Sequence, residues 1–299
     1  MTLNITVYLL LRCYNCLLYF CFSMEEMAVL AYLLPWDFSP LFVVLWVLVA
    51  VLYTRALLLN KEAASVKGLY WRAGCFYVGW LSVYIVWHTY FDYLSQYMFW
   101  VHRLQHLVLH HLAPLLMVLG AVELADKLVP ARSSIWLASP AFIKRPCELM
   151  YKFLQNAFIA PLLFVGLIYL WLWPGIHFSA MLNQNLYYLM NITMLLDGFL
   201  FWWLVLGAGW RGEERGFKMR IIMLAVVLVP QQLLGAYITL SSSIIYDVYD
   251  VCGRAWPISP SADQIYGGIV TWIPASMMSV LGFLLVLKRR FNYQQGLNV

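Results

Sequence analysis

The sequence predicts an all-α, polytopic membrane protein built as a bundle of seven transmembrane helices. Its 299 residues are 64% hydrophobic and only 11% charged. They include several apolar stretches of about twenty residues, the length that a helix needs to cross about 30 Å of hydrocarbon. Aromatic residues make up 17% of the chain, which is typical of Trp and Tyr side chains anchored at the two membrane interfaces.

The chain divides into an N-terminal apolar extension, residues 1–23, and a seven-span domain, residues 24–299. Arg12 lies in the middle of the extension and argues against both a signal sequence and a good span. If the extension also spans the membrane, the count becomes eight. Cys13 and Cys16 could bind a soft metal, although Cys in such a segment more often serves as small apolar packing. The six Cys of the chain are scattered and indicate no disulfide framework.

Each expected span is an apolar run bounded by polar, charged or aromatic residues. The spans cover about 41–59, 73–91, 97–122, 157–173, 186–207, a sixth run that ends near 240, and 264–287. The stretch 123–156 is polar and interrupted by Pro130, Pro140 and Pro146, and its last part, 148–156, predicts an interfacial helix.

Positive charge predicts the orientation of these spans. Of the 19 Lys and Arg residues, 16 lie in the loops after spans one, three and five and in the C-terminal tail, whereas the alternate loops hold only Arg254. The positive-inside rule places the charged loops and the C-terminus in the cytoplasm. The net charge of +5 therefore reflects topology, and we expect the lipid bilayer, and no nucleic acid, as a partner.

The third span carries four of the six His residues, and three of them recur at steps of four. His102, His106 and His110 would share one stripe of a regular helix, about 80° wide and roughly 12 Å long. Arg103 is expected to snorkel toward the head groups. Intramembrane ionisable residues are functional candidates by default, whereas polar residues that only join helices contribute about 0.6 kcal/mol per pair.

Several further polar residues are expected at the outer ends of the spans. His88 and Asp92 end span two, His177 lies in an outer loop, and Asp263 opens span seven. Two His four residues apart can share one metal, and neutral imidazole suits copper. We therefore expect a copper site of His102 and His106, with His110, His88 and Asp263 as auxiliary ligands, while packing is the more common role of a lone His such as His88 or His177. Asp197 in span five is either a proton or ion relay or a packing group paired with Asn191 or Thr193.

Several short sequence motifs follow one another in a defined order along the chain. They are Leu34–Pro40, His102–His106 continuing to Ala113 and Gly120, Arg145-Pro146, Gly198–Trp203, and Asp263–Gly268 with Trp272 and Pro274. Across about 34–287 this order resembles the membrane-embedded CtaG family of bacterial cytochrome c oxidase assembly factors. The resemblance implies a multi-pass protein of the bacterial cytoplasmic membrane that helps a haem-copper oxidase to mature by assisting its copper supply at the outer face. It also implies no turnover of its own, with oxidase subunits and periplasmic copper chaperones as partners.

The sequence departs from the family pattern at several positions. Members tend to have a His before the Pro that ends span four, where this chain has Leu172-Trp173-Pro174, and two His four residues apart in span five, where it has Tyr187 and Asn191. His110 and His111 stand where apolar residues or Met are usual. These departures leave an alternative open, an accessory structural subunit of a membrane oxidase or other copper enzyme. A haem-binding electron carrier is a second alternative, but its only readily available axial pair is His88 with His102 or His106, so we do not expect haem.

Overall fold

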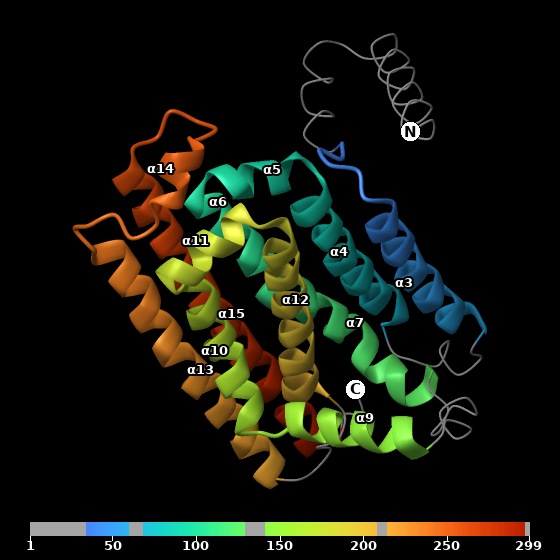
Figure 1. Ribbon diagram of the computed structural model, residues 1–299. Coiled ribbons are helices and arrows are strands. Elements are labelled where there is room, and N and C mark those ends of the chain that lie inside the picture. The colour runs from blue at the N-terminus through green and yellow to red at the C-terminus, as the bar shows by residue number, and fades with distance from the viewer. Residues whose placement is uncertain (1–33, 60–67, 129–140, 208–213, 297–299) are drawn as a thin grey trace, which may run out of the picture.

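The computed structural model describes residues 34–59, 68–128, 141–207 and 214–296, and these are almost entirely helical (Figure 1). The described part of the chain contains no β-strand, only an isolated bridge between Pro35 and Thr89. The all-α prediction is therefore confirmed. The predictions for residues 1–23 lie outside the described residues.

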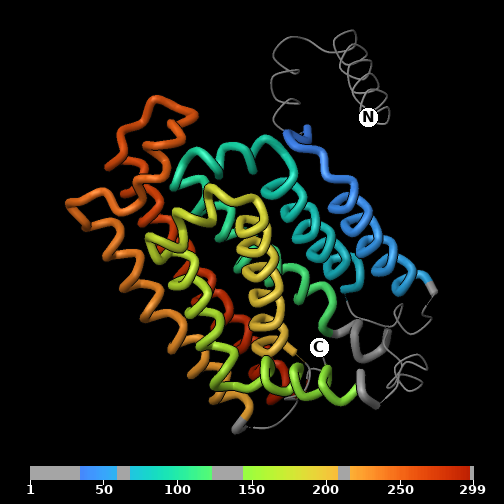
Figure 2. Tube along the Cα trace, in the orientation of Figure 1, coloured from blue at the N-terminus to red at the C-terminus, as the bar shows by residue number. Residues whose placement is uncertain are grey.

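Long helices run roughly side by side through the bundle, and shorter ones lie at its ends (Figures 1 and 2). The long elements are α3 (Pro40–Leu59), α4 (Leu69–His88), α6 (Phe99–Leu107) continued by a π-helical turn η2 (Val108–Leu112) and α7 (Ala113–Leu128), α10 (Ile159–Leu172), α12 (Gln184–Leu206), α13 (Glu214–Leu240) and α15 (Pro260–Gln294). The short helices are α5 (Tyr90–Tyr97), α9 (Ala141–Leu154), α11 (Pro174–Leu182) and α14 (Val248–Cys252).

Five helical stretches of the described chain are long and apolar enough to cross a membrane. They are Pro40–Leu58, Phe99–Val122, Gln184–Leu206, Gly216–Leu240 and Pro260–Gln294. The α9 and α10 pair makes a sixth if its two helices, bent by 78°, form one span. Helix α4 has 20 residues, but Arg72 and its many Tyr and Trp residues make it less apolar than these. A multi-pass membrane protein is thus supported, while the count of seven spans stays a prediction.

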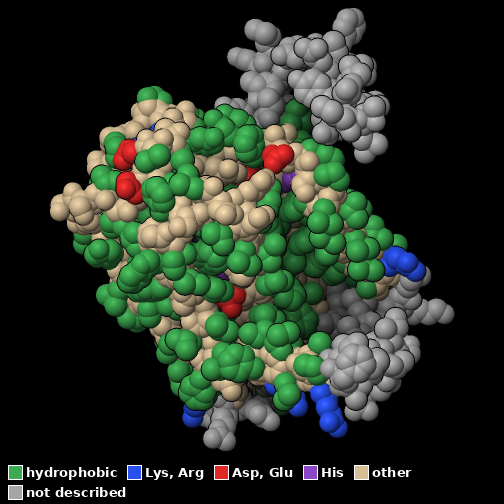
Figure 3. All heavy atoms as spheres, in the orientation of Figure 1, with side chains coloured by type: hydrophobic (Ala, Val, Ile, Leu, Met, Phe, Trp, Pro, Cys, Tyr) green, Lys and Arg blue, Asp and Glu red, His purple; other side chains and the backbone are tan. Residues whose placement is uncertain are grey.

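Helix α9 differs from the interfacial helix expected at 148–156. It begins at Ala141 and contains Pro146, so the prediction that Pro146 breaks this stretch is wrong. Proline removes one backbone donor, and the remaining turns of α9 persist around it. In the space-filling view, Lys and Arg side chains gather at the end of the bundle where α9 lies, and apolar side chains cover the middle (Figure 3).

The sequence predicts one regular helix over the histidine stretch, but the structure departs from this prediction at two points. Met98 is extended, with φ −143° and ψ 123°, so a new helix begins at Phe99. The π-helical turn then widens the spacing of side chains around residues 108–112. His110 and His111 are both buried, as are most residues of this central stretch.

Candidate functional site

Three imidazole rings gather at one end of α6. The ring centroids of His102 and His106 are 4.3 Å apart, and the ring of His177, from α11, lies 5.0 Å from that of His102. All three side chains are fully buried. The pair from α6 follows from its spacing of four residues. His177 lies far from this pair in the sequence. The only sequence evidence that it could approach His102 was its predicted position in an outer loop, on the same side of the membrane.

The nitrogens of these rings differ in what they contact. His177 Nδ1 donates to the carbonyl oxygen of Trp171 at 3.0 Å, and its Nε2 lies 3.0 Å from the hydroxyl of Tyr249. His106 Nε2 lies 3.2 Å from Asn191 Oδ1. Neither ring nitrogen of His102, in contrast, has a hydrogen-bond partner of regular geometry among the described residues, although the ring also interacts with the backbone of Ser95. Because buried polar groups are nearly always paired, His102 is the side chain of this cluster that is open to a ligand.

Burial also sets the charge of His177, which lies outside the candidate spans. Removal from water penalises the imidazolium and lowers the pKa of His177 to about 4. The ring is therefore uncharged at neutral pH, the form that binds metals.

Two departures from the family pattern face the histidine pair. Asn191 contacts His106 directly, and the ring centroid of Tyr187 lies 6.3 Å from that of His102. Both residues are on α12. The two α12 positions at which the resemblance led us to expect His are thus next to His102 and His106, and they hold a phenol and an amide.

Tyr187 belongs to a polar cluster that ties α5, α6 and α12 together. Its hydroxyl donates to Asp92 Oδ1 at 2.7 Å, and Gln105 Nε2 donates to the same oxygen at 2.8 Å. Gln96 Nε2 donates to the other carboxylate oxygen at 3.0 Å. Burial raises the pKa of Asp92 to about 6, although these donors oppose the shift. The cluster fixes α6, and hence His102, relative to α12.

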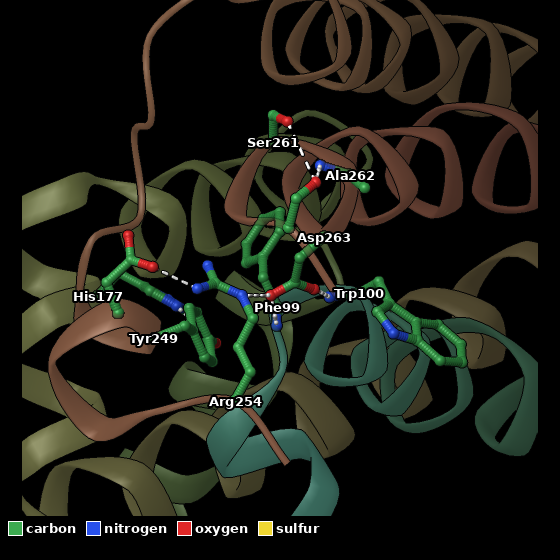
Figure 4. Close-up of polar contacts among 10 residues, drawn as sticks. Phe99, Trp100, His177, Tyr249, Arg254, Ser261, Ala262 and Asp263 are labelled. Carbon is green, nitrogen blue, oxygen red and sulfur yellow. Dashed lines mark hydrogen bonds and ion pairs between the residues drawn. The ribbon is translucent and has the colours of Figure 1, made fainter. Parts of the chain in front are cut away.

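Asp263 holds the N-terminus of α6. Its two carboxylate oxygens accept from the backbone N–H groups of Phe99 at 3.1 Å and Trp100 at 2.9 Å, and one of them also accepts from Arg254 Nε at 3.0 Å (Figure 4). A carboxylate at a helix N-terminus also interacts favourably with the helix dipole. Asp263 was expected as an auxiliary ligand, but these contacts place it at the start of the helix that carries His102.

The other predicted site residues lie apart from the three-ring cluster. The ring of His88 stacks on Phe42 of α3, with centroids 4.8 Å apart. His110 Nε2 contacts Asp197 Oδ2 at 3.1 Å, and its ring stacks on Phe164. Asp197 therefore pairs with a histidine, and not with Asn191 or Thr193 as the packing alternative had supposed.

Arg103 does not snorkel to the head groups. It is only 5% exposed, its Nε donates to Thr271 Oγ1 at 2.8 Å, and its Nη1 lies 3.5 Å from His106 Nδ1. The expectation failed because the guanidinium finds polar partners inside the bundle, on α15 and on its own helix. The sequence pattern around Arg103 does not reveal Thr271.

The described residues do not form a preformed metal site with three or more ligands. Across the four described ranges, no group of three or more His, Cys, Asp or Glu side chains could hold a metal ion. The arrangement is instead a buried imidazole pair with a third ring nearby, inside a helical bundle with several membrane-spanning helices. It defines a polytopic membrane protein with an intramembrane histidine site.

The particular family follows from comparison with known proteins. Residues 51–292 match the model of the cytochrome c oxidase caa3 assembly factor family (Caa3_CtaG). This match covers most of the chain, so the protein belongs to that family, as its sequence motifs suggested.

Curated relatives of this chain are mycobacterial proteins. An uncharacterized protein of Mycobacterium leprae (strain TN) is 28% identical over 186 residues, and one of Mycobacterium bovis is 28% identical over 189 residues. Each match covers 58% of this chain but only 27% of the relative, so the chain spans about a quarter of the length of these relatives. No solved structure matches.

Proposed function

We propose that this protein is an assembly factor for a bacterial haem-copper cytochrome c oxidase and that it takes part in copper delivery through His102 and His106. Membership of the caa3 assembly factor family supports the role in oxidase assembly. Copper is the cargo in this proposal, so the protein needs no catalytic residue of its own. Its partners are the oxidase subunits and, as suppliers of the ion, copper chaperones outside the membrane.

The copper proposal rests on the burial and the hydrogen-bonding of the His102 ring. This ring is completely buried, neither nitrogen has a hydrogen-bond partner of regular geometry among the described residues, and the ring of His106 lies 4.3 Å away. Two imidazoles four residues apart on a helix can hold one ion between them. Imidazole suits copper, and the pair leaves coordination positions open for ligands of a donor or acceptor protein, as transfer requires.

His177 is a third imidazole within reach of this pair. For its Nε2 to bind an ion, the ring must release the hydroxyl of Tyr249, to which it lies 3.0 Å away. The contact of Nδ1 with the carbonyl of Trp171 would persist and would hold the ring in the tautomer that leaves Nε2 free of a proton. Such a backbone contact is a common way to orient a metal-binding histidine.

The proposed location is the cytoplasmic membrane, with the histidine pair in the outer half and the C-terminus in the cytoplasm. The basic residues support it: α9, which carries Lys144, Arg145 and Lys152, and the C-terminal end of α15, which carries Lys288 and Arg290, lie at one end of the bundle (Figure 1). Helix α6, which carries His102 and His106, begins toward the other end, near α5 and α11. By the positive-inside rule the basic end faces the cytoplasm.

An accessory structural subunit of an oxidase remains the second candidate, and a specific observation favours it. Both nitrogens of His106 have neighbours, Asn191 at 3.2 Å and Arg103 at 3.5 Å. Tyr187 and Asn191 also stand where the resemblance led us to expect His. A subunit would co-purify with the mature oxidase in fixed stoichiometry, whereas an assembly factor would be found only with immature forms.

Copper retention by the purified protein tests the proposed site. After loading with copper(I) in detergent, we expect about one ion per chain in the wild type and a loss of at least tenfold in affinity in the double variant His102→Ala/His106→Ala. His88→Ala is the matched control, because His88 is also a buried imidazole with an unpartnered nitrogen but lies outside the cluster. Equal retention by the double variant and the control would remove copper from the proposal.

A further inference from the structure

The guanidinium of Arg103 is a buried positive charge without a carboxylate partner in the described part of the chain. Its polar contacts there are Thr271 and His106. The two carboxylates that contact α6, Asp263 and Asp92, bind the backbone of Phe99 and Trp100 and the side chain of Gln105. Arginine stays protonated inside proteins, and an isolated charge in a medium of low polarity is strongly unfavourable. An opposite charge close to Arg103 would therefore be stabilising.

A small cavity lies beside this guanidinium. Its volume is about 10 Å³, and its polar lining consists of Arg103, His106, His111, Gln231 and Thr271. Such a volume holds one water molecule or one monatomic ion. The remaining lining is apolar, with Ile168 and Met194 among it, so no other charged side chain offsets Arg103 there.

Among the described residues, the hydrogen bonds around the cavity leave one nitrogen, His111 Nδ1, and one acceptor, Gln231 Oε1, without a partner. Gln231 Nε2 lies 2.8 Å from His111 Nε2. Since an amide nitrogen can only donate, the neutral ring of His111 carries its own proton on Nδ1, and this atom has no partner. His111 is 2% and Gln231 1% exposed. Arg103 and His111 thus offer N–H donors beside a space lined by α6, the π-helical turn, α10, α12, α13 and α15.

We propose that this cavity is a binding site for a monatomic halide anion, chloride under ordinary conditions. The anion carries the charge opposite to Arg103 and accepts hydrogen bonds from the guanidinium and from His111 Nδ1. Polyatomic anions such as sulfate exceed the cavity. His111, in the π-helical turn, lines the cavity, while its neighbour His110 contacts Asp197 on α12.

A bound anion would also affect copper binding by His102 and His106. This consequence rests on the proposed function. Arg103 contacts His106, so its charge repels a copper ion held by His102 and His106. A bound anion would offset that repulsion. Anion binding itself does not depend on copper and is measured on the copper-free protein.

Gln231→Glu provides the sharpest test, because it places a carboxylate in the cavity without changing the size of the side chain. Purified, copper-free protein is melted in sodium chloride and in sodium gluconate or sulfate of equal ionic strength. We expect chloride to raise the wild-type melting temperature by about 3 °C at ten times its Kd. Gln231→Glu should show no chloride effect, since its carboxylate supplies the counter-charge, and Arg145→Gln, on exposed α9, should respond as the wild type does.

Two results would overturn the proposal. One is a wild-type melting temperature that is the same in chloride and gluconate, which would mean that the cavity holds water only. The other is a chloride effect of wild-type size in Gln231→Glu, which would place the anion elsewhere. If Gln231→Glu does not fold, the wild type alone decides, because bromide in place of chloride must give an anomalous scattering peak beside Arg103. Copper retention measured separately reports on the proposed function and not on this site.

Discussion

Replacement of Gly198 by Ala is expected to lower the free energy of unfolding by about 3 kcal/mol or more, the upper range for overpacking a core. A Cβ atom at this position of α12 would overlap the backbone carbonyl of His110 in the π-helical turn. A backbone group cannot rotate away as a side chain can, so the two elements must separate. The change should also break the contact between His110 and Asp197, which depends on this close approach.

Gly166→Ala is the matched control for this prediction. Gly166 lies on α10, and a Cβ there would meet nothing within 4 Å. Ala is the better helix former by up to about 1 kcal/mol, so this variant should be as stable as the wild type or slightly more so. Thermal unfolding in detergent measures both variants. Equal melting temperatures for Gly198→Ala and Gly166→Ala would show that α12 does not pack against the π-helical turn as described.

Asp263→Asn is the second change with a large expected effect, again about 3 kcal/mol or more. The substitution removes the charge that Arg254 pairs with and weakens the two hydrogen bonds to the start of α6. Its side chain is fully buried, and that of Arg254 is only 10% exposed, so the remaining positive charge has little water to compensate it. Copper retention should fall too, because α6 carries His102 and His106.

Arg254 also provides the matched control for the Asp263→Asn prediction. Asp250 also pairs with Arg254, but the Asp250 side chain is 42% exposed, and exposed ion pairs contribute little. Asp250→Asn should therefore change the free energy of unfolding by less than about 1 kcal/mol. A similar loss in both variants, measured by thermal unfolding, would mean that the pairing with Arg254, and not the contact with α6, accounts for the effect of Asp263.

Hydropathy and residue spacing were sufficient to predict the helical class and the shared helix face of His102 and His106, whereas the family was predicted from the resemblance of several ordered motifs. The long apolar runs predicted α3, α12 and the end of α13 to within two residues because lipid exposure demands apolar side chains, whereas α15 begins before and ends well beyond the expected span 264–287. The pair His102 and His106 followed from the period of the helix. The break at Met98 could not be predicted, because no Pro or Gly lies at that point. The π-helical turn has a local signal that was missed, because Pro114 lies two residues beyond it and a proline cannot make the regular bond to the carbonyl four residues earlier, that of His110.

The rest of the site depends on contacts between residues far apart in the chain. His177 contacts His102 because α11 folds back over the end of α6, and Thr271 meets Arg103 across 168 positions. Asp263 was predicted at the correct end of the bundle, but periodicity could not reveal that its carboxylate faces the backbone of Phe99. Sequence patterns identify which residues are unusual for a membrane span, whereas the tertiary structure decides their partners.

The copper content of the client oxidase tests the central claim most directly. Membranes are prepared from cells that produce the wild type, His102→Ala/His106→Ala or His88→Ala as their only copy of this protein, at equal protein levels. We predict that the oxidase purified from the double variant contains haem but much less copper, and that His88→Ala gives the wild-type ratio. A fully copper-loaded, active oxidase in cells with the double variant would contradict copper delivery through this histidine pair.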